Sequence, residues 1–473
     1  MASTADDLFR KLTVGVRFTK RDLDKDRIKK KEVKQESDEI DFFKNSTGAA
    51  PVRKKAKKCK LLKTPEEVAA FRREHEIRVY GSDVPAPIRS FHQLDMKSSV
   101  LETLKSEEIK QPTAVQMQGI PLLMAGRDSF VIAPTGSGKT LVFVLAILAK
   151  LLSEESNDNI RALVISPTRE LALQIKGQFK RFTPKDIGIN AVLLNKAVLN
   201  GWKKRAPKRY PSILVSTPKR LVQAIEAEAV KLNFVKQLVL DEADKLLELG
   251  LMEQIDDILM GTKESKLQTM LFSATIPTGI EQLARSFMID DEPVRLVVGA
   301  PNGATSDIDQ QLLFVGQEEG KLMAVRQLLL SGQLFPPTII FCETIERANA
   351  LHESLKEAQM SVDLMHAGRS QTERETIINS FRNGNLWFLI TTELLARGLD
   401  FPEVAAVLNY DFPASTASYI HRIGRTGRAG KQGKAITLFT MDDAEKLKIV
   451  ANVMRQSGCS VPDWLLSRCG IKH

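Results

Sequence analysis

Short apolar runs alternate with longer amphipathic stretches along most of this 473-residue chain, and the alternation occurs in two series. The first series has strand-like runs that begin at residues 129, 162, 212, 237 and 269, and the second has similar runs between residues 338 and 440. A Gly-, Pro- and Asn-rich stretch, "GAPNGATSD", separates the two series. Apolar strands that alternate with helices predict a parallel sheet covered on both faces. The sequence therefore predicts two α/β domains in series.

The segment "VIAPTGSGKT" at residues 131–140 carries the strongest local signal. An apolar strand leads into a turn of small residues, and "LVFVLAILAK" then reads as a buried helix. Small residues allow backbone N–H groups to surround a phosphate, which also meets the positive end of the helix. We expect Lys139 to neutralise the outer phosphates of a nucleotide and the Thr140 hydroxyl to ligate Mg²⁺. The remaining phosphate-loop residues are Thr135, Gly136, Ser137 and Gly138.

Three carboxylates follow an apolar run in "LVLDEADKLLELG" at residues 238–250. A helix N-terminus alone is one explanation, because the helix dipole favours acidic side chains there. The phosphate loop offers a second explanation, that the carboxylates belong to a ligand site, since ligands bind at the carboxyl ends of the strands in open α/β sheets. We expect Asp241 to hold Mg²⁺, directly or through water, and Glu242 to polarise the water that attacks the γ-phosphate.

The segment "YIHRIGRTGRAG" at residues 419–430 offers positive charge for a phosphoryl-transfer transition state. Arg422, Arg425 and Arg428 recur every three residues with glycines between them. The alternative is a solvated basic helix, but glycine disfavours an ordinary surface helix. An arginine from the second domain would complete the site only when the two domains close.

The composition is typical of an intracellular protein that binds polyanions. A formal net charge of +10 favours nucleic acid as a partner. The four cysteines lie far apart without zinc-type spacing, and no N-terminal apolar segment indicates secretion. The longest apolar stretch, which begins at Leu141, is too short to span a bilayer, so we expect no membrane association.

Residues 1–70 read as a basic tail that is disordered, because charge runs dominate and apolar periodicity is weak. The segment "RKKAKKCK" at residues 53–60 is interpreted as a nuclear localisation signal or a nucleic-acid-binding arm. A merely solubilising tail is the alternative.

Together these segments resemble those of DEAD-box RNA helicases of superfamily two, over roughly residues 70–460. The tetrad at residues 241–244 is the motif that names that family. The resemblance implies two RecA-like domains that bind ATP and hydrolyse it in response to RNA. It also implies that Phe91 stacks on adenine, that Gln116 hydrogen-bonds to the adenine edge, and that Asp400 meets the ribose. Arg425 and Arg428 match the arginine fingers of the family.

The resemblance also assigns residues that couple the ATP state to domain closure and residues that contact RNA. The segment "SAT" at residues 273–275 is implied to contact the last acid of the tetrad. The coupling residues are Asp244, Ser273, Thr275 and His421. The RNA contacts suit phosphates and 2′-hydroxyls better than base edges, so binding should be largely independent of sequence. The first-domain contacts are Pro167, Thr168, Arg169, Thr217, Pro218 and Arg220, and the second-domain contacts are Gly368, Gln371, Arg374, Thr391, Thr392 and Gly398.

The chain departs from the family pattern at three places. Lys219 stands where the family usually has glycine, and the double glycine between the first RNA motifs is missing from "AVLLNKAVL". Glu393 replaces the usual aspartate in "TTELLARGLD". The first two departures bear on the path of RNA over the first domain. None removes a catalytic group, so ATP hydrolysis is still expected.

The domain boundaries and the biological role follow from the same resemblance. We predict a tail at 1–70, an ATP-binding domain at 71–298, a linker at 299–308, a helicase C-terminal domain at 309–455 and an extension at 456–473. The segment "ANVMRQSGCSVPDWLL" resembles the branch that acts on pre-ribosomal RNA of the small subunit. It implies a nuclear, nucleolar protein whose partners are pre-ribosomal particles and protein cofactors.

The expected mechanism is ATP-dependent closure of the two domains on RNA, which bends one strand of a short duplex and releases the other. An ATP-gated RNA clamp or assembly scaffold without productive unwinding is the main alternative, because it would share these motifs. A DNA translocase is disfavoured by the segment around Gln116 and by Asp244.

Overall fold

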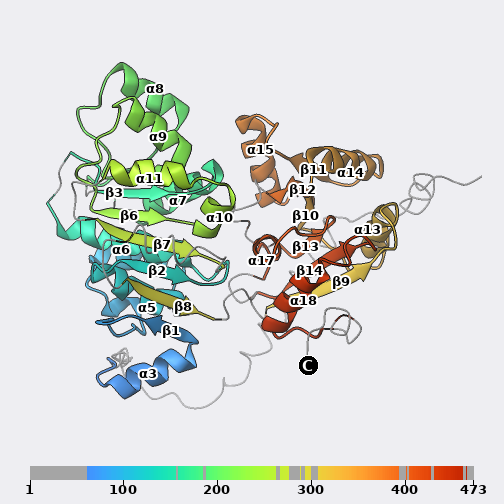
Figure 1. The fold of residues 1–473 in the computed structure, drawn as a ribbon, viewed down its shortest axis with the longest axis horizontal. Helices are drawn as coiled ribbons and strands as arrows, with labels where there is room; N and C mark the ends of the chain where they lie inside the picture. Colours follow the sequence, from blue (N-terminus) through green and yellow to red (C-terminus); the bar gives the residue numbers. More distant parts are fainter. Residues whose placement is uncertain are drawn as a thin grey trace, which may run out of the picture.

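Two sheets with helices around them form the two halves of the chain (Figure 1). The computed structural model describes residues 61–155, 158–184, 188–262, 267–275, 288, 293–299, 307–393, 401, 404–427, 431–461 and 465. The strand order is β1-β8-β2-β7-β6-β3-β5-β4 in the first sheet and β11-β12-β10-β13-β14-β9 in the second. Among the described residues the strand pairs are parallel, except that β1 is antiparallel to β8. The predicted class of two α/β domains is confirmed.

The strands are short, and in the described ranges most of them follow or precede a helix. The strands of the first sheet are β1 (Ile77–Tyr80), β2 (Ser129–Ile132), β3 (Ala162–Ile165), β4 (Ala191–Leu193), β5 (Ile213–Ser216), β6 (Gln237–Leu240), β7 (Gln268–Ser273) and β8 (Val294–Val298). Those of the second are β9 (Ile308–Phe314), β10 (Thr338–Cys342), β11 (Val362–Met365), β12 (Phe388–Thr392), β13 (Ala406–Asn409) and β14 (Gly433–Phe439).

The helices divide between the two sheets in the same order. Those of the first domain are α3 (Pro65–Glu74), the 3₁₀ turn η1 (Phe91–Gln93), α4 (Ser98–Ser106), α5 (Ala114–Met124), α6 (Lys139–Ser153), α7 (Arg169–Phe182), α8 (Lys196–Lys204), α9 (Pro218–Glu226), α10 (Ala243–Glu248) and α11 (Met252–Met260). Those of the second are α13 (Gly320–Leu330), α14 (Ile345–Glu357), α15 (Gln371–Arg382), α17 (Thr416–Ile423) and α18 (Leu447–Gln456).

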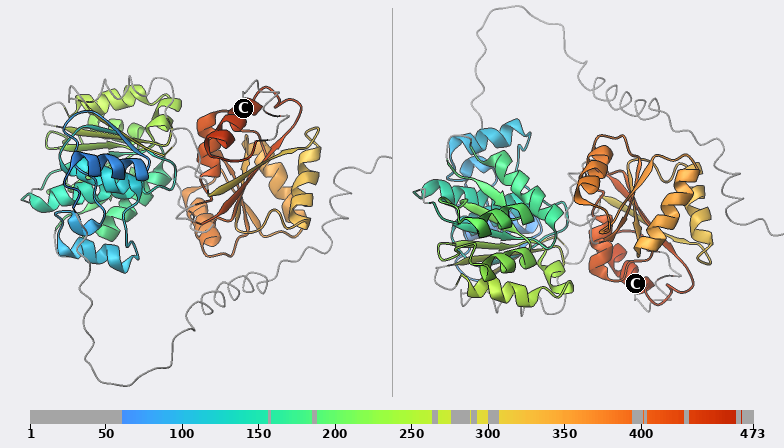
Figure 2. Two further views of the ribbon diagram at one scale, coloured as in Figure 1. Left: turned by 90° about the horizontal axis from the view of Figure 1, so that it is seen from below. Right: turned by 90° about the horizontal axis from the view of Figure 1, so that it is seen from above.

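The central strands are largely apolar because helices cover both faces of each sheet (Figure 2). In β3, Val164 joins the core beneath α6 and α7, whereas Leu163 and Ile165 join the core beneath α9 and α11. In β12 the same alternation sends Ile390 toward α13 and α14, and Leu389 toward α15. These apolar runs therefore contribute to hydrophobic cores on both faces of each sheet.

Helix α3 corrects the predicted extent of the disordered tail. Residues 1–60 lie outside the described residues, but α3 begins at Pro65, inside the segment assigned to the tail. The Thr64 hydroxyl accepts a hydrogen bond from the Glu67 N–H, and Phe71 is buried against the first domain. A capped helix with one buried aromatic residue is stable here because it packs on a preformed core, a contact that charge patterns do not reveal.

The apolar segment that begins at Leu141 is a core helix, as predicted. In α6 the side chains from Leu141 to Leu148 are buried, and the helix packs beside α5 and α7. In the ranges that the structure covers, none of the helices combines the length and apolar character needed to cross a membrane.

Candidate active site

The phosphate loop joins β2 to α6, and its conformation requires glycine. Gly136 and Gly138 have φ values of 78° and 93°, in the left-handed region that favours glycine. A Cβ added to Gly138 would lie 2.4 Å from Gln116 Nε2, so a side chain there would also collide with its neighbour. Gly138 caps α6 without a side-chain hydrogen bond, which leaves the helix N-terminus open toward the loop.

Lys139 is the cation of this loop, and its side chain is half-buried. Its ammonium donates hydrogen bonds to the carbonyl oxygens of Ala133 and of Pro134, the latter at 2.9 Å. Burial lowers the pKa of Lys139 to about 8, although the carboxylate of Asp241 acts in the opposite direction. The ammonium is therefore held inside the loop, where it can exchange backbone oxygens for phosphate oxygens.

A cavity of about 440 Å³ opens beside the loop and includes side chains from both domains. The first domain contributes the predicted residues Gln116, Thr135, Gly136, Gly138, Lys139, Thr140, Asp241 and Glu242, and the second contributes His421 and Arg425. The structure thus gathers most of the predicted ATP-site residues around one cavity. A volume of this size matches the range of small-molecule and cofactor sites.

Two carboxylates project from the carboxyl end of β6, as the sequence led us to expect. Burial raises the pKa of Asp241 to about 7, and the neighbouring charge of Glu242 acts in the same direction. Glu242 has a φ of 50°, a left-handed conformation that is uncommon for a residue with a side chain. Its Oε2 atom is buried and has no hydrogen-bond partner among the described residues. Strained residues with unpaired polar atoms are typical of functional sites.

The residues present fit a hard divalent cation. The Thr140 hydroxyl and the Asp241 carboxylate both line the cavity, and oxygen atoms are the ligands that Mg²⁺ prefers. Burial, together with the neighbouring charge of Glu242, raises the pKa of Asp241, and the nearby charge of Lys139 does not offset the two effects. A cation that arrives with a nucleotide would supply further positive charge.

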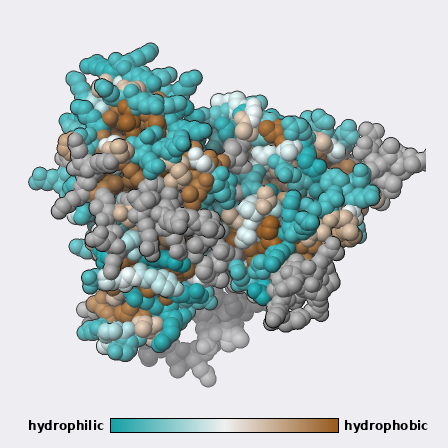
Figure 3. Space-filling view, viewed as in Figure 1, coloured by the Kyte–Doolittle hydropathy of each residue, from teal (hydrophilic) through white to brown (hydrophobic). Residues whose placement is uncertain are grey.

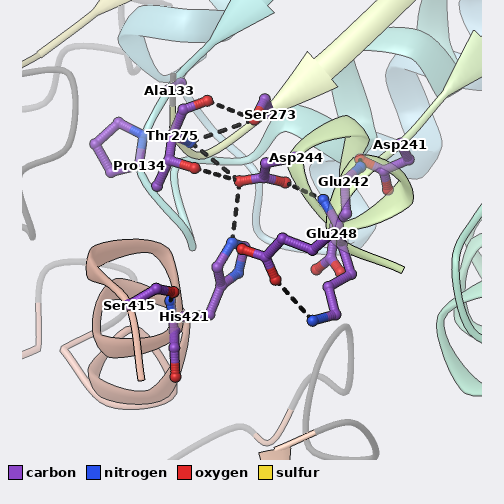
Figure 4. Close-up of polar contacts among 12 residues, drawn as sticks. Ala133, Pro134, Asp241, Glu242, Asp244, Glu248, Ser273, Thr275, Ser415 and His421 are labelled. Carbon is purple, nitrogen blue, oxygen red and sulfur yellow. Dashed lines mark hydrogen bonds and ion pairs between the residues drawn. The ribbon is translucent and has the colours of Figure 1, made fainter. Parts of the chain in front are cut away.

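Asp244 connects the two domains through the coupling residues (Figure 4). Its Oδ2 atom accepts hydrogen bonds from the Thr275 hydroxyl at 2.7 Å and from the Thr275 N–H at 3.2 Å. The same oxygen lies 3.1 Å from His421 Nε2 on α17 of the second domain. Burial raises the pKa of Asp244, but the charge and hydrogen bond of His421, the hydrogen bond of Thr275 and the charge of Lys139 together hold this pKa well below its usual range. Ser273 is buried and donates to the Thr275 carbonyl oxygen, which fixes the shape of this turn.

The second-domain arginines divide into two kinds. Arg425 lines the cavity, and its Nε donates to the His421 carbonyl oxygen at 3.0 Å. Arg422 instead donates to the Glu393 carboxylate at 3.0 Å and to the Asp411 carbonyl oxygen at 2.8 Å. Glu393, the residue that departs from the family pattern, therefore fixes α17 to the end of β12. The predicted residues Arg428, Asp400 and Gly398 lie outside the described residues.

Gly424 is a functional position that sequence reasoning missed. It follows α17 and lies against the phosphate loop of the other domain: an added Cβ would be 1.8 Å from Thr135 Oγ1 and 2.9 Å from Thr135 Cβ. Only a residue without a side chain allows this approach between the domains. The glycines of the segment predict only that an ordinary helix is disfavoured there, because the contact of Gly424 with Thr135 depends on the tertiary structure.

The two residues predicted to recognise adenine have different surroundings. Gln116 is buried against the phosphate loop, where Nε2 donates to the Gly138 carbonyl oxygen at 3.2 Å and Oε1 accepts from the Thr113 N–H at 3.0 Å. Thr113 also donates from its hydroxyl to the Ser137 carbonyl oxygen at 2.7 Å. Phe91 is packed in the hydrophobic core and does not line the cavity. The structure therefore places Gln116 at the ATP cavity and Phe91 in the hydrophobic core of the first domain.

Several predicted RNA contacts surround a second cavity, of about 400 Å³, between the domains. The first domain lines it with "PTRE" at residues 167–170 and with residues 217–219, and the second domain adds Ala367 and Arg374. Leu249 and Leu251, which sequence reasoning missed, form its apolar part. The predicted contacts gathered here are Pro167, Thr168, Arg169, Thr217, Pro218 and Arg374.

The other predicted RNA contacts do not line this cavity. Arg220 donates to Gln223 on its own helix, and Gln371 donates to Glu375. Thr391 is fully buried, and its hydroxyl donates to the Thr392 carbonyl oxygen, so it is not available as an RNA contact in this arrangement. Gly368 donates its N–H to His366 Nδ1 at 3.2 Å.

Arg374 has a first-domain partner that sequence reasoning missed. It forms an ion pair with Glu170, and both side chains are largely buried where α15 faces α7. Burial makes such a pair sensitive to loss of either partner, because an unpaired buried charge is costly. The pair holds the two domains together beside the second cavity.

We expect Glu170→Gln and Arg374→Gln to be strongly non-additive. Each should weaken the combined binding of an ATP analogue and RNA, and a double-mutant cycle should give a coupling of about 0.5–3 kcal/mol. Fluorescence anisotropy of a labelled RNA, measured with saturating analogue, provides the four affinities. Additive effects would show that the ion pair does not contribute to closure.

This arrangement defines a class of protein. A phosphate loop, two carboxylates at the end of a neighbouring strand and an arginine from a second domain form the site of a P-loop ATPase that works between two α/β domains. The chain matches the DEAD/DEAH box helicase family over residues 113–283 and the helicase conserved C-terminal domain over residues 320–430. The chain belongs to the DEAD/DEAH box helicase family, and its activity is that of an RNA-dependent ATPase and ATP-dependent RNA helicase.

Curated relatives and solved structures agree with this assignment. The chain is 44% identical to the ATP-dependent RNA helicase ROK1 of Lodderomyces elongisporus over 85% of its own length and 74% of that protein. It is 42% identical to ROK1 of Saccharomyces cerevisiae, with 84% and 72% covered. S. cerevisiae Dbp5 bound to RNA and ADP BeF3 is similar with a TM-score of 0.68 at 28% identity, covering 81% of this chain and 99% of that one. Mss116p bound to ssRNA and AMP-PNP has a TM-score of 0.69 at 26% identity, covering 82% and 83%.

Proposed function

We propose that the protein uses Mg²⁺-ATP to close its two domains on the backbone of an RNA strand and thereby separates a short duplex or remodels an RNA–protein particle. The observation that carries the proposal is the single hydrogen-bonded group at Asp244, which joins the ATP side of the first domain to α17 of the second. The first domain and α17 of the second domain are thereby linked through one buried carboxylate.

Closure is favoured only if ATP and RNA bind the closed state more tightly than the open one. Arg425 and His421 complete the ATP cavity from the second domain, while Ala367 and Arg374 complete the second cavity. Each ligand therefore gains contacts when the domains meet.

Strand displacement of a short labelled RNA duplex tests the proposed helicase activity. RNA-stimulated ATP turnover without strand release would instead support the ATP-gated clamp. Equal stimulation by DNA would contradict RNA specificity.

Lys139→Ala is expected to weaken ATP binding by roughly 10- to 100-fold, because hydrogen bonds to charged groups contribute about 1.5–3 kcal/mol. Titration with a fluorescent ATP analogue measures the loss. Lys150→Ala, near the far end of the same helix, is the matched control and should bind normally. Unchanged affinity in Lys139→Ala would remove this lysine from the phosphate site.

We further propose that the substrate is pre-ribosomal RNA of the small subunit and that the protein works in the nucleolus with pre-ribosomal particles and protein cofactors. The basic cluster at residues 53–60 and the C-terminal segment at 451–466 support this role. Cross-linking of the tagged protein to RNA in cells, combined with imaging, tests it. Cross-links concentrated on small-subunit precursor RNA and a nucleolar signal are expected. Cross-links mainly to messenger RNA, or a cytoplasmic signal, would contradict it.

A further inference from the structure

The ATP cavity continues past the phosphate loop to a second end, where the segment between α4 and α5 meets the last turns of α7. We call this part the base end, and it is lined by Ile109, Gln111, Gln178, Arg181 and Phe182. Thr113 and Gln116 connect it to the phosphate loop, because they donate hydrogen bonds to the carbonyl oxygens of Ser137 and Gly138. A nucleotide with its phosphates at Lys139 would therefore extend its base toward the base end.

The base end has no open aromatic ring among the described residues. Phe182 is the only phenylalanine, tyrosine or tryptophan among the described residues that line the cavity, and it is 1% exposed. Phe91 packs in the core instead. Bases stack on guanidinium planes as well as on aromatic rings. Arg181 is thus the side chain at this end that can offer a delocalised planar group to a base.

Arg181 is held in place from two sides. Its guanidinium forms an ion pair with the carboxylate of Glu107, which lies two residues before Ile109. The guanidinium carbon also lies over the Phe182 ring, 5.9 Å from the ring centroid. The Arg181 side chain is nevertheless 45% exposed, so part of the group remains open to a ligand. A guanidinium that is already oriented loses less conformational freedom when a ligand binds.

The position of this ion pair distinguishes it from other exposed pairs. Hydrophilic residues cover much of the face seen in Figure 3, and exposed ion pairs contribute little to stability. The exposed pair of Arg209 with Asp158 does not line the ATP cavity. Arg181 does line it, whereas Glu107 does not. Glu107 can therefore act on a nucleotide only through Arg181.

We propose that Arg181 stacks its guanidinium on the base of the bound nucleotide and that Glu107 is a positioning residue for Arg181. Ile109 contacts the base from the segment between α4 and α5. This inference rests on the proposed function, the use of Mg²⁺-ATP. Helix α7 then contacts both ligands, since it begins with Arg169 at the second cavity and ends with Arg181 at the base.

The test compares a ligand that carries a base with a ligand that has none. Calorimetric titration of the full chain gives the Kd of a non-hydrolysable ATP analogue and of tripolyphosphate, each with Mg²⁺. Arg181→Ala should weaken binding of the analogue by about 3- to 30-fold, the contribution of a cation–π contact. Binding of tripolyphosphate should not change. Lys180→Ala is the matched control, because Lys180 is an exposed neighbour that does not line the cavity.

Two further variants separate stacking from charge and from a structural role. Arg181→Lys keeps the charge but removes the planar group, so it should lose nearly as much affinity for the analogue as Arg181→Ala. Glu107→Gln should weaken binding of the analogue by a smaller factor. Added to Arg181→Ala, it should have no further effect, because residues that act through one another are not additive.

The outcomes separate this inference from the proposed function. If the wild-type chain does not bind the ATP analogue, the proposed function fails. If it binds and Arg181→Ala or Arg181→Lys keeps the wild-type affinity, the stacking role of Arg181 is wrong. Equal losses for the analogue and for tripolyphosphate would place Arg181 at the phosphates and also overturn it. A loss in Lys180→Ala as large as in Arg181→Ala would do the same, since the effect would then come from overall charge.

Discussion

Glu242→Gln should reduce kcat for RNA-stimulated ATP hydrolysis by about 10²- to 10⁴-fold, the usual contribution of a positioned general base. The substitution keeps the shape of the side chain but removes its ability to accept a proton from water. In the structure Glu242 Oε2 is buried and unpaired among the described residues, next to Lys139 and Asp241. ATP and RNA binding should be preserved, because neither the phosphate loop nor the RNA cavity loses a residue.

Steady-state turnover and equilibrium binding, measured on the same preparation, test this prediction. Glu248→Gln provides the control, since Glu248 lies on the same short helix and pairs with Lys245 outside the cavity. Its turnover should remain within about twofold of wild type. Full turnover by Glu242→Gln would exclude Glu242 as the base and direct attention to another acceptor for the proton.

Gly424→Ala should lower RNA-stimulated ATP turnover by about 10²-fold while leaving each domain folded. The added Cβ would meet Thr135 of the phosphate loop at 1.8 Å from Oγ1, so the domains must separate to accommodate it. Misplacement of catalytic groups by about 1 Å is enough for such a loss. Arg425, the next residue, would then no longer reach its position in the ATP cavity.

The matched control is Gly201→Ala, because a Cβ at Gly201 meets nothing within 4 Å. Its turnover should be normal, and helix α8 should gain about 0.5–1 kcal/mol. Binding of an ATP analogue without RNA should be nearly unchanged in Gly424→Ala, since the first domain supplies the phosphate loop. Normal RNA stimulation in Gly424→Ala would mean that the domain contact at Thr135 is not part of the active state.

The sequence predicts those parts of the fold whose signals are local. Runs such as 162–165 are apolar at every position because both faces of the sheet are covered, and they were recognised as strands. Strands β1, β4, β8 and β9 are not among the predicted runs: β1 and β9 contain charged or amide side chains, β4 has three residues, and β8 contains Arg295. Of these, β1, β4 and β9 lie at sheet edges, whereas the edge strand β11 is predicted. Edge strands are less buried, so their composition resembles that of loops.

The candidate site divides in the same way. The phosphate loop and the acidic tetrad were found because backbone geometry and charge dictate their residue types at short spacing. The contacts of Gly424 with Thr135 and of Arg374 with Glu170 join residues separated by hundreds of positions, and no local pattern indicates them. The motif resemblance predicts that Phe91 contacts adenine, whereas in the structure Phe91 packs in the first-domain core, a placement that depends on tertiary packing.

The central claim is that RNA and ATP act through one closed arrangement held at Asp244. The most direct measurement is steady-state ATP hydrolysis by the full chain, with and without RNA, in the wild type and in His421→Ala. Strong stimulation by RNA in the wild type, largely lost in His421→Ala although ATP still binds, is the predicted result. Turnover that is indifferent to RNA in the wild type, or stimulation that is intact without His421, would contradict the account.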